Sequence, residues 1–159
     1  KSLSAGCYLP NVIREEVEVT VAVDVSGSIS QREYSEFIGE MIGIAKCFQQ
    51  VKMNVLFWDT EVGTDLSVYN GNIETIQSAN VKGYGGTDFS CVAKYLQKEN
   101  KRPKVLVCFT DGYIEENPKE PEGVQTLIYV ICSNGDDKIV KKSDNGIVIK
   151  MKKDHEERY

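Results

Sequence analysis

The chain has 159 residues, 41% of them hydrophobic, which is the size of one globular domain with a single core. Its net charge is -5, and acidic and basic residues are interspersed, so a basic surface for nucleic acid or an anionic membrane is not expected. No apolar run approaches the ~20 residues that span a bilayer, and we therefore expect a soluble protein.

The first predicted elements are a strand and a helix. After a lead-in segment (residues 1–16), residues 17–23 (VEVTVAV) form a β-rich, mostly apolar run. A helix should begin at Ser30, because Ser30 and Glu33 have the spacing of a capping box. The apolar stripe of this helix consists of Tyr34, Phe37, Ile38, Met41, Ala45 and Phe48.

A pair of strands is predicted next. Residues 52–58 (KMNVLFW) form the second strand, and the turn-rich residues 59–64 connect it to a short third strand at residues 65–69. Such a connection indicates a hairpin, so the third strand should be an antiparallel edge strand. Residues 72–81 are ambiguous and indicate at most a helical turn.

The second half of the chain continues the alternation of helix and strand. A helix with one apolar stripe follows a glycine-rich segment, and two strands that are apolar on both faces come after it, as expected of covered parallel strands. A short helix, a last strand and a charged tail complete the chain. The ranges are 89–100 for the helix, 104–112 and 124–133 for the strands, 136–143 for the short helix, 146–151 for the last strand and 152–159 for the tail.

This alternation predicts one α/β domain over residues 17–151, with a doubly wound, Rossmann-like, mostly parallel sheet and one antiparallel edge strand. Ligands of such sheets bind outside the carboxyl ends of the strands, near the topological switch point. The residues that follow the predicted strands are therefore the candidates for function.

Those positions carry hard oxygen donors. Asp24, Ser26 and Ser28 follow the first strand at alternate positions, which directs them to one side of an extended chain. Thr87 follows the glycine-rich segment, and Asp111 follows the strand VLVCFT. Two carboxylates and three hydroxyls suit Mg²⁺, or Mn²⁺, because Mg²⁺ takes only one or two carboxylates from protein.

Each motif also has an interpretation without metal. DVSGS could be a strand-to-helix turn in which Asp24 accepts backbone hydrogen bonds, and Thr87 or Asp88 could be an ordinary helix N-cap. The TDG at Asp111 is a common turn. The three motifs occur together in order, each after the right element, and this favours the metal site.

DVSGS, GGTD and FTDG resemble the elements of the metal-ion-dependent adhesion site of von Willebrand factor type A (VWA) domains, and the resemblance extends from Val17 to Met151. It implies that Ser26, Ser28 and Thr87 contact the ion, with Asp24 and Asp111 often acting through water.

The resemblance can be narrowed to one group of VWA-like domains by three features, namely LPNV, GGTDF and the region after FTDG. They look most like the VWA-like domain of unknown function that follows a metallopeptidase-like domain in bacterial and phage proteins. The resemblance implies, as partners, a MoxR-type AAA+ ATPase or a preceding domain of the same protein.

The residues favour a binding module over an enzyme. Two ionised carboxylates balance a divalent cation, and an acidic side chain of a partner could fill an open coordination position. A metal-dependent hydrolase or phosphoesterase would need a positioned base, and the only histidine, His155, lies in the charged tail. The other alternative is a metal-free structural interaction domain.

Two further expectations concern the surface. Between residues 113 and 124, where VWA domains commonly have a helix, Pro118 and Pro121 interrupt an acidic segment, so a covering helix should be absent. We expect an exposed apolar area there that a partner buries. Asp59 could join the rim of the metal site or start the hairpin turn, and the turn is favoured.

The five cysteines are scattered and never spaced as CxxC, so neither a zinc site nor a disulfide framework is expected. Cys108 and Cys132 lie in apolar runs, as buried reduced cysteines would. This cysteine usage predicts a cytoplasmic location.

Overall fold

One sheet of six strands organises the part of the chain that the computed structural model describes, residues 16–48, 50–69, 72, 74–77 and 85–153. The strand order is β3-β2-β1-β4-β5-β6, and every neighbouring pair is parallel except β2 and β3. The strands are β1 (Glu16–Asp24), β2 (Gln50–Trp58), β3 (Val62–Tyr69), β4 (Val105–Thr110), β5 (Thr126–Ile131) and β6 (Gly146–Lys150). The predicted α/β sheet with one antiparallel edge strand is confirmed.

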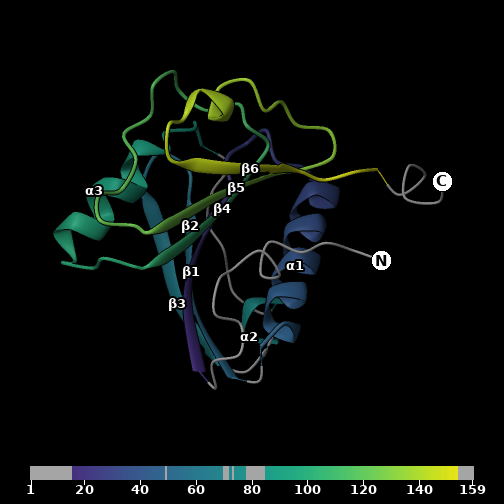
Figure 1. Cartoon of the computed structure of the whole chain (residues 1–159). Helices are drawn as coiled ribbons and strands as arrows, with labels where there is room; N and C mark the ends of the chain where they lie inside the picture. Colours follow the sequence, from purple (N-terminus) through teal and green to yellow (C-terminus); the bar gives the residue numbers. More distant parts are fainter. Residues whose placement is uncertain (1–15, 49, 70–71, 73, 78–84, 154–159) are drawn as a thin grey trace.

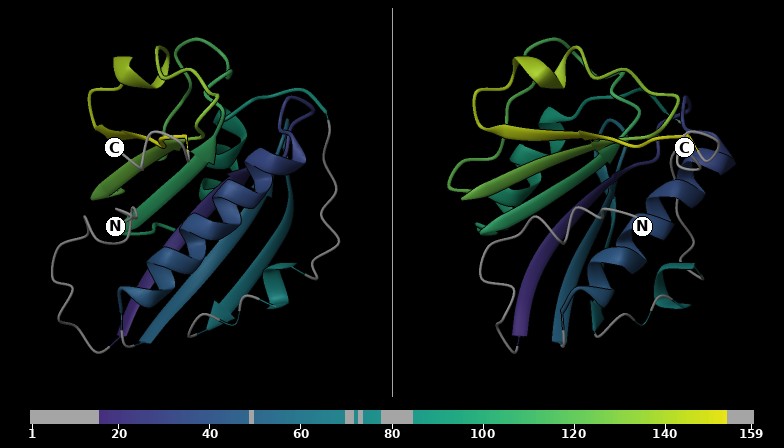
Figure 2. Two further views of the ribbon diagram at one scale, coloured as in Figure 1. Left: turned by 90° about the vertical axis from the view of Figure 1, so that its right-hand side faces the viewer. Right: turned by 45° about the vertical axis from the view of Figure 1, so that its right-hand side comes forward.

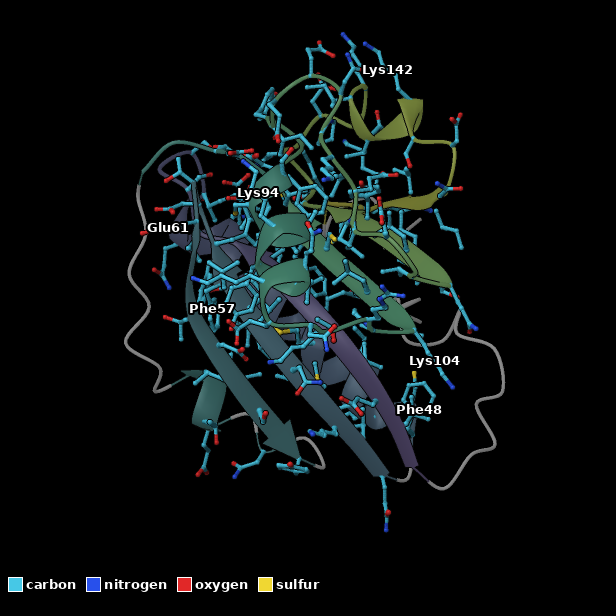
Figure 3. All side chains as sticks on the ribbon, turned by 90° about the vertical axis from the view of Figure 1, so that its left-hand side faces the viewer. Phe48, Phe57, Glu61, Lys94, Lys104 and Lys142 are labelled. Carbon is cyan, nitrogen blue, oxygen red and sulfur yellow. The ribbon has the colours of Figure 1, made fainter. Side chains whose placement is uncertain are left out.

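Helices lie on both faces of this sheet (Figure 1). Figure 2 shows α1 crossing one face, and Figure 3, viewed from the opposite side, shows α3 with Lys94 in front of the strands. The described helices are α1 (Gln31–Lys46), α2 (Glu74–Gln77), α3 (Ser90–Lys98) and the 3-10 helix η2 (Val140–Lys142).

The alternation of side chains along β1 explains why both faces are covered. Val19, Val21 and Val23 are fully buried in the core on the α1 side, whereas Ala22 belongs to the core on the α3 side. Successive residues of a strand point to opposite faces, so an apolar run of this kind needs a cover on each face.

The start of α1 is as predicted. The Ser30 hydroxyl accepts a hydrogen bond from the Glu33 amide at 3.1 Å, and the Glu33 carboxylate accepts one from the Ser30 amide at 2.8 Å. This capping box satisfies two amides of the first turn. The helix ends at Lys46, so Phe48 of the predicted stripe lies beyond it, although it is buried.

Several boundaries differ from the predicted ones. The third strand starts at Val62 rather than at residue 65, because it pairs with the end of β2 through a register shift at Trp58. The predicted short helix at residues 136–143 is only the 3-10 turn η2. The boundaries of the lead-in segment and the tail stay predictions, since most of these residues, His155 included, lie outside the described ones.

The connection between β4 and β5 contains no helix, as the prolines predicted. It nevertheless covers the sheet, because Ile114 and Tyr129 are only 7% and 1% exposed. Glu120 fastens the connection by accepting hydrogen bonds from the Tyr129 hydroxyl and, at 2.7 Å, from the Ser143 hydroxyl. The chain thus screens part of this face itself, but Tyr113 of the same connection is 56% exposed, so the expectation of an exposed apolar area for a partner stays a prediction.

The cysteines differ from expectation at one position. Cys91, Cys108 and Cys132 are free and buried, whereas Cys47 is disulfide-bonded, which the cysteine spacing did not predict. Disulfides are rare in the cytosol, so the cytoplasmic location stays a prediction with one observation against it. No helix among the described residues is long and apolar enough to cross a membrane.

Candidate metal centre

The strand order places the candidate site at the topological switch point. The chain leaves β1 for β2 on one side, and β4 lies on the other side of β1. In an open α/β sheet the crevice outside the carboxyl ends of such strands is the usual ligand site. Asp24 is the last residue of β1, and Thr110 is the last residue of β4.

A connected set of hydrogen bonds joins four of the five predicted ligands. The Ser28 hydroxyl donates to Asp111 Oδ2 at 2.7 Å, and the hydroxyls of Ser26 and Ser28 are 3.3 Å apart. Asp24 Oδ1 accepts from the Ser26 amide at 2.9 Å. Its other oxygen, Oδ2, accepts from the Thr110 hydroxyl at 2.7 Å, so this contact bridges the ends of β1 and β4.

The environment of the Asp24 carboxylate disfavours its charged form. It has no exposed surface, and burial raises its pKa from 3.8 to about 6. The nearby Asp111 carboxylate raises the pKa further, while the hydrogen bonds from Ser26 and Thr110 lower it. Burial outweighs the hydrogen bonds because it removes water from the charged form.

Backbone amides hold Asp111 in place. The Tyr113 amide donates to Asp111 Oδ1 at 3.1 Å, and the Asp136 amide donates to the Asp111 carbonyl at 2.9 Å. The turn requires glycine at position 112, where φ is +85° and a Cβ would lie 1.7 Å from the Asp136 carbonyl oxygen. The backbone of this turn therefore fixes the orientation of the Asp111 side chain.

Neither carboxylate has a basic partner in the part of the chain that the structure describes. Asp111 is 2% exposed, and among the described residues neither Asp24 nor Asp111 forms an ion pair. Buried charges are normally paired or bound to a metal ion, so two adjacent buried carboxylates suit the binding of a cation.

The donor set has the composition that suits Mg²⁺ or Mn²⁺. Within the described ranges no three His, Cys, Asp or Glu side chains are grouped so that they could hold a metal ion. A Mg²⁺ site does not need such a group, because it takes one or two carboxylates and completes its shell with neutral oxygen donors.

Thr87 lies on a neighbouring loop. The Gly27 amide donates to the Gly85 carbonyl at 3.0 Å, which joins the DVSGS turn to the GGTD segment. Within the described residues, the Thr87 hydroxyl makes no hydrogen bond to the other four predicted ligands. Its contact with the ion therefore stays a prediction.

The hydrogen bonds of Asp59 agree with the prediction that it starts the hairpin turn. Its Oδ1 accepts hydrogen bonds from the Thr60 and Glu61 amides at 2.5 and 3.3 Å, as at the start of a polar turn. It also lies close to the glycine segment, because a Cβ on Gly85 would be 2.9 Å from Asp59 Oδ2.

Two residues that shape the site were not predicted from the sequence. Thr110 is part of the FTDG motif, and its place at the end of β4 was a usable signal. No sequence pattern indicates a role for Glu115, because only the tertiary fold brings it to residues 89 and 90. The assigned N-cap of α3 is Phe89, but the Asp88 carboxylate accepts a hydrogen bond from the Ser90 amide at 3.1 Å, as the N-cap interpretation of Asp88 predicts.

Comparison with known proteins identifies the family. A search of curated proteins found no match. The family model described as VWA-like domain (DUF2201) matches residues 19–151, which run from within β1 to just beyond β6 and include all five predicted ligands. The chain therefore belongs to the VWA-like domain family DUF2201.

Proposed function

We propose that this VWA-like domain is a divalent-metal-dependent protein-binding module. In this proposal Asp24, Ser26, Ser28, Thr87 and Asp111 hold Mg²⁺ or Mn²⁺. The observation that carries it is the pair of buried carboxylates, Asp24 and Asp111, which share a hydrogen-bonded row with two serine hydroxyls and lack a basic partner in the described residues.

The arrangement suits recognition of an acidic side chain. Ionised Asp24 and Asp111 supply two negative charges, and the hydroxyls supply none. The bound ion would supply an open coordination position for a carboxylate from a partner. Asp24, Ser26 and Asp111 are buried whereas Ser28 is exposed, so the row of donors reaches the surface at Ser28.

No observation favours catalysis. A hydrolase or phosphoesterase would need a positioned base beside the metal, and the described residues include no histidine. We therefore do not propose an enzyme. A metal-free interaction domain remains the competing function, and metal titration separates it from the proposed one.

The partner is proposed from the resemblance to intracellular VWA-like domains. It is an acidic side chain of a protein, either a MoxR-type AAA+ ATPase or a preceding domain of the same protein, and neither nucleic acid nor a membrane is a partner. A cytoplasmic location belongs to the same proposal.

A Mg²⁺ titration followed by thermal unfolding tests the metal. The wild type should gain about 2.7 kcal/mol of unfolding free energy at a metal concentration of 100 times Kd. Asp24→Ala should show no gain, while the control Asp144→Asn, an exposed position in the turn before β6, should keep it. A wild type that does not respond to Mg²⁺ or Mn²⁺ contradicts the proposal.

Capture experiments then test the partner. The immobilised domain should retain a purified MoxR-type ATPase in Mg²⁺ and release it in EDTA. Retention that is equal in EDTA, or equal with Asp24→Ala, would favour the metal-free alternative.

A further inference from the structure

We propose that Glu115 is a positioning residue for the metal centre, because it holds the segment that carries Thr87 against the segment that carries Asp111. This inference rests on the proposed function. Glu115 does not contact the ion. It only positions one ligand, Thr87.

Glu115 caps α3 from a distant part of the chain. Its Oε1 accepts from the Phe89 amide at 2.8 Å, and its Oε2 accepts from the Ser90 amide at 2.9 Å and from the Ser90 hydroxyl at 2.6 Å. The N-cap residue Phe89 makes no side-chain cap of its own. The Glu115 carboxylate thus satisfies amides at a positive helix end, where a negative charge is favourable.

The same side chain connects the two halves of the site. Glu115 lies four residues after Asp111 on one connection, and Phe89 lies two residues after Thr87 on another. Asp88, next to Thr87, shares the Ser90 amide with Glu115, since Asp88 Oδ1 accepts from that amide at 3.1 Å. Together with the hydrogen bond from the Lys119 amide to the Ser90 hydroxyl at 2.8 Å, the Glu115 carboxylate therefore joins the segments of Asp111 and Thr87.

Thr87 depends on such anchors on both sides. On its N-terminal side, Gly85 accepts the hydrogen bond from Gly27 at 3.0 Å. On its C-terminal side, the Asp88 amide donates to the Asp59 carbonyl at 2.9 Å, and Glu115 holds the residues that follow. Since the Thr87 hydroxyl has no described hydrogen bond to the other four ligands, these anchors decide where it lies.

Glu115→Gln tests this role with little change in shape. A glutamine has one acceptor oxygen in place of two, so it cannot accept from Phe89 and Ser90 on separate oxygens. Its amide group can still donate to Asp88, which keeps the local packing. Loss of a residue that orients a metal ligand typically weakens metal binding by roughly 10- to 100-fold.

Mn²⁺ alone is the probe, and its Kd is measured by electron paramagnetic resonance. We expect Glu115→Gln to raise the Kd about tenfold. The matched control is Glu116→Gln, because Glu116 is the exposed neighbour and forms an ion pair with Lys142, and its Kd should stay within about twofold of the wild type. Unfolding in EDTA is measured for each variant, so that a stability effect is separated from a change in Kd.

A double-mutant cycle shows whether Glu115 acts through Thr87. In a Thr87→Val background, Glu115→Gln should weaken Mn²⁺ binding no further, because the hydroxyl that it positions is gone. Glu115→Asp keeps the charge but shortens the reach, so it should also raise the Kd and serves if Glu115→Gln does not fold.

The outcomes separate this inference from the proposed function. If the wild type binds Mn²⁺ and Glu115→Gln leaves the Kd unchanged, the inference fails and the metal centre stands. An equal loss with and without the Thr87 hydroxyl also overturns it, because Glu115 would then act by another route. A wild type that binds no Mn²⁺ refutes both.

Discussion

Replacing the buried carboxylate of Asp24 by a neutral amide of the same shape tests the energetics of the site. In Asp24→Asn, the Oδ1 can still accept from the Ser26 amide. The Thr110 hydroxyl can turn to accept from the new amide group, because a hydroxyl both donates and accepts. The main change is therefore the loss of a buried negative charge.

The expected magnitude follows from the pKa of Asp24. The pKa is raised from 3.8 to about 6, so the folded protein favours the protonated form. The contribution to stability is fully present below pH 3.8 and is lost as pH rises through about 6. At about 1.4 kcal/mol per pKa unit, ionised Asp24 destabilises the metal-free fold by about 3 kcal/mol at pH 7.5.

We therefore expect Asp24→Asn to be more stable than the wild type in EDTA at pH 7.5, by up to about 3 kcal/mol. The advantage should shrink as the pH is lowered to 4.5, where the wild-type carboxyl is protonated. In Mg²⁺ the wild type should gain stability and the variant should not. Urea unfolding at both pH values, with and without Mg²⁺, measures all of these differences.

The control is Asp144→Asn, which changes the net charge equally at an exposed position and should leave stability almost unchanged in every buffer. The reasoning is refuted if Asp24→Asn is less stable than the wild type in EDTA at pH 7.5. That result would show that the Asp24 carboxylate serves the fold through its hydrogen bonds and is not kept for a cation.

Other substitutions test the surroundings of the site by thermal or urea unfolding and by Mg²⁺ titration. Gly112→Ala should cost about 3 kcal/mol or more, because its φ is +85° and a Cβ would clash with a backbone carbonyl oxygen. Gly39→Ala, in open space on α1, should instead stabilise by about 0.5 to 1 kcal/mol. Ser30→Ala should cost about 1 kcal/mol through loss of the cap, without changing the Kd for Mg²⁺. Thr110→Val should raise that Kd about tenfold, since it removes a hydrogen bond that orients Asp24.

The local part of the fold could be predicted because its causes are local. The alternating valines of β1 need a core on each face, and the capping box of Ser30 and Glu33 needs only residues three apart. The absence of a helix before β5 follows from Pro118 and Pro121. Each of these features is a property of a short stretch of sequence.

The features that were missed depend on contacts between distant residues. Whether the sheet beside Ile114 is bare or covered depends on Glu120, which bonds to Tyr129 on β5 and to Ser143 beyond it. No periodicity in the sequence contains that information. The disulfide at Cys47 was missed for the same reason, because spacing along the chain does not determine distance in space.

The same distinction applies within the candidate site. Asp24, Ser26 and Ser28 could be predicted together because one extended segment directs them to one side. Their junction with Asp111 required the parallel pairing of β1 with β4, which an alternating α/β pattern indicates but does not specify. The cap from Glu115 required the full path of the connection after β4.

A metal ion bound at this site would link metal binding to the stability of the domain. The fold buries Asp24 next to Asp111, and in the absence of a cation the burial opposes folding. Thr110 and Ser26 reduce that opposition without removing it, because the pKa of Asp24 stays raised. A cation would stabilise the ionised pair and the fold together, so the metal-loaded domain should be both the stable form and the form competent to bind a partner.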